Sequence, residues 1–185
     1  MMKRINNLPV LTCIAFFLWV IFFILGLWLG RNGHFIMWAN NLPLEILTTP
    51  YEGRFERMAD IALENKQVLL GVLIYINNLT YIFINILIGL LTLGVGVLFN
   101  LGASGLKYGL IISSTTVLKS DVVIFEMLEY ISVIIGNALS AYFIISTFRN
   151  TKIEIKKVCF TLALIMLLLL IGAILEISII TNMIS

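Results

Sequence analysis

Residues 68–99 read VLLGVLIYINNLTYIFINILIGLLTLGVGVLF, an almost continuous apolar run of 32 residues. A run of about 18 or more apolar residues is long enough to cross the hydrocarbon core of a bilayer. As one straight helix this run would be roughly 48 Å long against a core of about 30 Å, so it must break, tilt or protrude. Asn77 and Asn78 are poor helix formers side by side, and we expect the break there, leaving residues 80–99 as the span.

Further apolar runs lie on both sides of this one. Of the 185 residues, 61% are apolar and 12% are charged, whereas soluble domains carry roughly 25% charged residues. We therefore predict an all-α polytopic membrane bundle that forms a single domain over residues 1–185. Its five expected transmembrane helices cover residues 10–30, 80–99, 103–118, 122–146 and 158–181.

The segment between the first two spans differs in composition. Residues 31–67 mix acids and bases with Pro43 and Pro50, and after Pro50 the apolar residues recur at helical spacing. We expect residues 31–79 to form an extracytoplasmic amphipathic segment on the membrane surface. The charged part holds 37 residues, fewer than the roughly 40 that a segment needs to fold alone.

The basic residues predict the orientation, because short loops rich in Lys and Arg stay on the cytoplasmic side. They gather at the amino terminus and in the loop of residues 147–157: Lys3, Arg4, Arg149, Lys152, Lys156 and Lys157. With five spans both segments lie on the same side. We therefore place the amino terminus and Lys107 inside and the carboxyl terminus outside.

Three acids fall inside predicted spans: Glu126, Glu129 and Glu176. A charge at the centre of a membrane helix costs about 2.5–3.5 kcal/mol on insertion scales, so each needs an explanation. In the predicted topology these acids share the outer half of the membrane with Asn77 and Asn78. We interpret the five residues as a polar intramembrane cluster. It either forms an acidic cleft for a cationic ligand, a peptide or a proton, or only joins helices by hydrogen bonds.

Small and amide residues mark the expected helix contacts. Gly102, Gly105 and Gly109 stud the third span, and small residues let neighbouring helices approach closely. Asn78, Asn85 and Thr92 recur every seven residues on one stripe, which either joins helices or lines a conduction path.

The residues that intramembrane chemistry requires are missing from the sequence. There is no Ser, His and Asp set, no Gly-rich phosphate loop, and no partner at metal-ligand spacing for the lone His34. We predict no catalytic residue, no metal, no cofactor and no enzymatic activity.

From residue 76 to 143 the order of residues resembles the stage II sporulation protein M family, whose members also occur in circular-bacteriocin gene clusters. The matches are the paired Asn77 and Asn78, the glycine-studded Gly89, Gly94 and Gly96, then Asn100 with Gly102, the family glutamate at Glu129, and Gly136. The family's His-Gly is missing, since Phe125 and Glu126 stand there. The resemblance covers about a third of the chain.

This resemblance implies a non-enzymatic component of a multi-protein system in the bacterial plasma membrane, serving export, maturation or self-immunity of a secreted peptide. The implied partners are membrane lipid, other membrane subunits or an ABC-type ATPase, and a cationic circular bacteriocin. The net charge of +2 gives no argument for nucleic acid. Two alternatives stay open: an autonomous ion- or proton-coupled channel or transporter, which would purify as a homo-oligomer, and a sporulation-type protein of envelope remodelling.

Overall fold

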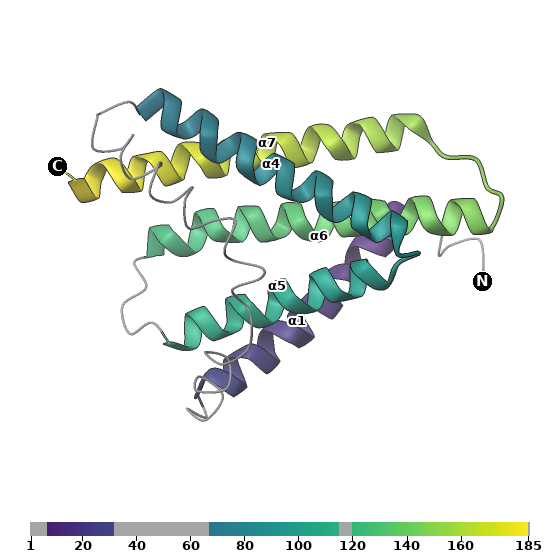
Figure 1. Cartoon of the computed structure of the whole chain (residues 1–185), viewed down its shortest axis with the longest axis horizontal. Helices are drawn as coiled ribbons and strands as arrows, with labels where there is room; N and C mark the ends of the chain where they lie inside the picture. The colour runs from purple at the N-terminus through teal and green to yellow at the C-terminus, as the bar shows by residue number, and fades with distance from the viewer. Residues whose placement is uncertain (1–6, 32–66, 115–119, 185) are drawn as a thin grey trace.

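The computed structural model describes residues 7–31, 67–114 and 120–184, and this part of the chain is all-helical (Figure 1). Its five helices are α1 (Leu8–Arg31), α4 (Gln67–Leu91), α5 (Val95–Ser114), α6 (Ser120–Phe148) and α7 (Ile155–Ile184). Most of the expected amphipathic segment, residues 32–66, lies outside the described residues. Its last part, residues 67–79, is instead the first half of the apolar helix α4.

Four of the described helices are long and apolar enough to cross a membrane: Leu8–Arg31, Gln67–Leu91, Met127–Phe148 and Ile155–Ser178. Their outer surfaces are apolar as well. Val68, Leu91 and Phe160 are each more than 70% exposed, although burying such side chains would normally stabilise a soluble protein. These helices indicate a membrane protein.

Helix α6 occupies the centre of the bundle (Figure 1). Within its spanning window 61% of the residues are buried, compared with 22–28% in the other three spanning helices. The main core therefore forms around α6, with Ile134, Ala138 and Leu139 packed against α1, α4, α5 and α7.

The expected break at Asn77 and Asn78 is wrong, because α4 continues through both residues to Leu91. The chain turns later, at Thr92–Gly94, where the Gly94 N–H donates to the Gly89 carbonyl at 2.9 Å. Leu93 and Gly94 have left-handed backbones, with φ of 51° and 98°, and glycine adopts this region at little cost. The long apolar run is thus divided into two helices by a helix-ending turn.

The turn at Thr92–Gly94 also changes the expected start of the third helix. The residues expected to separate the second and third spans, Asn100 and Gly102, lie inside α5, which begins at Val95. The Thr92 hydroxyl accepts a hydrogen bond from the Gly96 N–H at 2.7 Å and so caps the start of α5.

Helices α1 and α5 pack in parallel through small residues. A Cβ built on Gly105 would lie 2.6 Å from the Trp19 carbonyl oxygen, and one on Gly109 would lie 2.7 Å from the Leu27 nitrogen and 2.9 Å from the Gly26 Cα. Such positions are sterically forbidden for a side chain. The close approach of the two backbones therefore requires glycine on α5.

The helices alternate in direction, with α1, α5 and α7 running one way and α4 and α6 the other (Figure 1). The turn at 92–94 and the connection between α6 and α7 consequently lie toward the same end of the bundle. Lys107 lies within α5, away from this end, so the expectation that it joins the basic residues of the inner loops is wrong.

Candidate functional site

The polar cluster expected inside the membrane centres on a contact between α4 and α6. The Asn78 side-chain amide donates a hydrogen bond to the Glu129 Oε1, across 51 residues of sequence. Both side chains are half-buried. The amide offers two donors and the carboxylate only acceptors, so the pair is chemically complementary. Both Asn78 and Glu129 are residues on which the family resemblance rests, and the structure brings them into contact.

Apolar side chains pack beside this pair. Ile82 and Ile86, one and two turns further along α4, are buried against α6, and Gly136 of α6 receives them. An acid in such surroundings gains more from a hydrogen bond or a cation than it would in water, because the local dielectric is low. Glu129 can therefore act as an acceptor for a positive charge or as a proton carrier, and it already joins two helices.

The other expected members of the cluster lie on α4, α6 and α7. Glu176 is half-buried on α7 beside Ile177, which packs against Gly71 near the start of α4. Gly71 precedes Asn78 by about two helical turns, roughly 10 Å along the axis. Asn77 is half-buried on α4. Glu126 lies in α6, but the side chains of residues 120–126 are outside the described part of the chain.

Lys107 lies closer in depth to the acids than the sequence suggests. The rings of Tyr108 and Tyr130 contact each other with centroids 4.5 Å apart. Their sequence neighbours, Lys107 on α5 and Glu129 on α6, therefore lie at the same level of the bundle. Lys107 is exposed. The expectation that Lys107 lies inside, away from the acids of the outer half, is therefore wrong.

The asparagine stripe of α4 divides into three different roles. Asn78 binds Glu129, as described above. Asn85 is buried, at 5% exposure, and Thr92 caps α5. The three residues of the stripe therefore have different surroundings.

Small residues at the far end of the α4–α6 contact bring three helices together. A Cβ on Gly89 would collide with the Ser140 hydroxyl of α6 and would lie 2.9 Å from Val97 of α5. The Ser140 hydroxyl also donates a hydrogen bond of 3.2 Å to the Ile86 carbonyl. Gly94, expected at a helix contact, lies instead in the turn.

The other expected contact residues divide between two interfaces. Gly102 faces the ring of Phe22 on α1, next to the contacts of Gly105 and Gly109 described above. Gly96 lies against Thr92 and Ile88 beside the turn.

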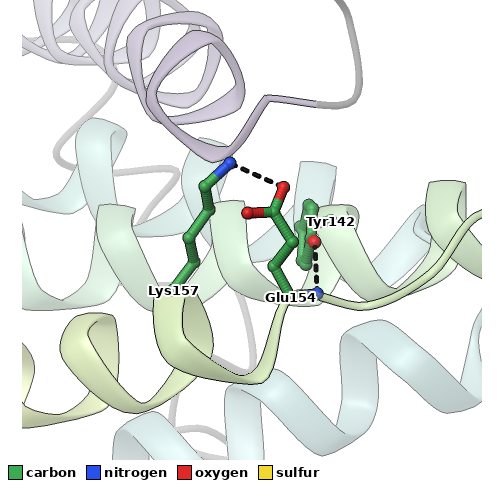
Figure 2. A network of polar contacts seen from close by, with 3 residues as sticks. All are labelled: Tyr142, Glu154 and Lys157. Atoms are coloured by element: carbon green, nitrogen blue, oxygen red, sulfur yellow. Dashed lines mark hydrogen bonds and ion pairs between the residues drawn. The ribbon is translucent and has the colours of Figure 1, made fainter.

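The basic connection between α6 and α7 is anchored by a buried tyrosine (Figure 2). The Glu154 N–H donates to the hydroxyl of Tyr142, at 3.0 Å, and Tyr142 is 2% exposed. The Glu154 carboxylate forms an ion pair of 2.7 Å with Lys157. Lys152 and Lys156 are exposed. The loop thus presents positive charge on a fixed backbone.

Reasoning from the sequence missed the polar residues of α6. Ser132, Asn137 and Ser140 are completely buried. A signal was available, since polar residues recur through residues 132–146 of an otherwise apolar run.

The described residues contain no group of three or more His, Cys, Asp or Glu side chains that could hold a metal ion. An open apolar groove of about 250 Å³ lies between α1 and α6, lined by Thr12, Cys13, Phe16, Phe17, Ile131, Ile134 and Ile135. Such a groove on a membrane protein suits lipid chains.

Comparisons with protein-family models, with curated proteins and with solved structures gave no match for this chain.

Proposed function

We propose that this chain is a non-enzymatic subunit of the bacterial plasma membrane that helps to handle a secreted cationic peptide, with Glu129 as the acceptor of positive charge. The observation that carries the proposal is the Glu129 carboxylate, half-buried among apolar helices and held by Asn78. An ionisable residue within a membrane helix marks a functional site by default, since its insertion is costly. The family resemblance supports the same residue and suggests export, maturation or self-immunity as the process.

The proposed topology has five crossings, with the amino terminus inside and the carboxyl terminus outside. Its support is the distribution of basic residues, because Arg149, Lys152 and Lys156 lie at one end of the bundle. Glu129 belongs to the first half of α6 and is therefore nearer the opposite, outer end. A peptide arriving from outside would reach it without crossing the whole membrane.

The working partners in this proposal are an exporter ATPase of the ABC type or other membrane subunits. The connection between α6 and α7 offers the contact surface on the inner side, with its exposed lysines and a backbone anchored by Tyr142. A soluble partner would approach the exposed charges and pair with them through acidic residues.

Substitution of Glu129 tests the proposal. Glu129→Gln keeps the shape and an acceptor for Asn78 but removes the charge, so it should leave membrane abundance unchanged and abolish secretion of the peptide or protection from it. Glu129→Leu should also lower abundance, because the Asn78 amide loses its acceptor. Glu176→Gln is the matched control on α7. Full function in the Glu129→Gln variant would refute the role of the charge.

The depth of Lys107 favours a second candidate function, an ion- or proton-coupled transporter. Lys107 and Glu129 lie at one level of the bundle, and ionisable residues inside membranes are typical of coupling sites. Purified protein in liposomes loaded with a pH-sensitive dye distinguishes the two functions. Flux through the protein alone that disappears in Glu129→Gln supports the transporter, and its absence supports the subunit.

A further inference from the structure

Three asparagines from three helices share one level of the bundle core. The contact of Gly89 with Val97 and Ser140 brings α4, α5 and α6 together. Asn85 precedes Gly89 by four residues, Asn137 precedes Ser140 by three, and Asn100 follows Val97 by three. Residues three or four apart lie on the same face of a helix. Each asparagine therefore faces the junction of the three helices.

The directions of the helices place these residues on the same side of that contact. Helices α4 and α6 are parallel, and α5 runs against them (Figure 1). Moving toward the amino end of α4 or α6, or toward the carboxyl end of α5, therefore leads to the same end of the bundle. Asn85, Asn100 and Asn137 are thus each about one turn, roughly 5 Å, from the Gly89 contact toward the same end.

Each asparagine brings one buried polar atom without a hydrogen-bond partner among the described residues. These atoms are the Nδ2 of Asn85, the Nδ2 of Asn100 and the Oδ1 of Asn137. Asn85 is 5% exposed and Asn137 is fully buried. The Asn137 Nδ2 donates to the Val133 carbonyl at 2.9 Å, which fixes its Oδ1 as the atom that faces away. Leaving such groups unpaired in a low dielectric costs free energy.

We propose that one water molecule is bound at this junction and is part of the folded structure. Water accepts two hydrogen bonds and donates two, so it can receive the amides of Asn85 and Asn100 and donate to the Asn137 oxygen. Buried waters make about three such bonds to otherwise unpaired groups. A bare alkali cation fits less well, because two of the three partners are donors. The water joins α4, α5 and α6 about two turns from Glu129.

Nuclear magnetic resonance on the complete chain in nanodiscs, labelled with ¹⁵N-asparagine, tests the water directly. The side-chain amide protons of Asn85 and Asn100 should each show a magnetisation-transfer cross-peak to a long-lived water, and both should weaken in Asn137→Leu. Transfer between the asparagine amides themselves, with no water signal, would overturn the proposal. Amide shifts that change when sodium replaces choline in the buffer would also overturn it, in favour of a cation.

A double-mutant cycle gives an independent test. Asn85→Leu and Asn137→Leu should each lower the thermal midpoint in detergent by about 3 °C. The double variant should lose clearly less than the sum, because the second substitution acts on a water already displaced. Ser132→Ala is the control, since its hydroxyl bonds the Leu128 carbonyl of its own helix, and it should add to Asn85→Leu in full. Additive losses for the asparagine pair would contradict a shared water.

Discussion

Alanine at position 109 should disrupt the close contact between helices α1 and α5. A Cβ there would point at the Phe23 carbonyl of α1 and lie 2.7 Å from the Leu27 nitrogen, where ordinary contact begins at 3.4 Å. The shortfall of 0.7 Å is against backbone, which no rotamer change can relieve. Helices α1 and α5 must therefore separate locally and lose contacts along the interface.

The expected cost of Gly109→Ala is about 2 kcal/mol, within the usual range for overpacking. For a chain of this size that lowers the thermal midpoint by about 4–8 °C. The measurement is thermal unfolding of the detergent-solubilised protein, followed by circular dichroism and by tryptophan fluorescence. Trp19 belongs to this interface and contacts Phe23, Tyr108 and Tyr130, so its emission should change in the same transition.

Gly102→Ala is the matched control on the same helix. The three atoms nearest to its Cβ would all belong to the ring of Phe22, at 3.3–3.4 Å, and a side chain can move by a few tenths of an ångström. Replacing glycine by alanine within a helix stabilises both variants by roughly 0.5–1 kcal/mol, because it lowers the backbone entropy of the unfolded chain. The difference between the two thermal midpoints therefore measures the steric clash. Equal midpoints for Gly109→Ala and Gly102→Ala would refute the close approach of α1 and α5.

Three further experiments test the turn, the loop and the topology. Leu93→Gly should raise the thermal midpoint by about 2–4 °C, because Leu93 is 67% exposed and has a left-handed φ of 51° that costs about 1 kcal/mol; a lower midpoint would contradict this. Tyr142→Phe should cost about 1 kcal/mol by removing the acceptor of the Glu154 N–H, whereas Glu154→Gln should leave the midpoint unchanged because its ion pair is exposed. With both native cysteines replaced by serine, a cysteine at Arg31 should react with an impermeant reagent from outside, and one at Asn150 only after permeabilisation; the reverse pattern would invert the proposed orientation.

The existence of the apolar helices could be predicted from the sequence, but the boundaries of α4 and α5 could not. Hydropathy alone identifies the runs that become α1, α4, α6 and α7. The break was expected at Asn77 and Asn78 from their low helix propensity. In the folded chain a hydrogen bond to Glu129, far away in sequence, and the buried Leu70 and Ile74 keep this stretch helical. Tertiary contacts outweighed a local preference of less than 1 kcal/mol per residue.

The turn at Thr92–Gly94 carried a weaker sequence signal. Gly94 is a suitable helix-ending residue, and glycine past a helix end is common. The position before it is a leucine in a left-handed backbone, which no propensity would suggest. The residues of the candidate site could be chosen from the cost of burying acids and amides, but their pairing depends on α4 lying beside α6, and sequence does not give that arrangement.

The register between α4 and α6 explains why the charge of Glu129 can be tested separately from the fold. Lipid provides no hydrophobic drive for one helix to bind another, so small and polar residues determine how helices align. Three contacts fix successive levels of the parallel helices α4 and α6. They are the hydrogen bond from Asn78 to Glu129, the packing of Ile82 and Ile86 against Gly136, and the hydrogen bond from Ser140 to the Ile86 carbonyl. A slip of one turn, about 5.4 Å, would break all three contacts together. The contacts at Gly136 and Ser140 do not involve the carboxylate, so they keep the register of α4 and α6 in the Glu129→Gln variant. A loss of function in that variant is then caused by the loss of the charge.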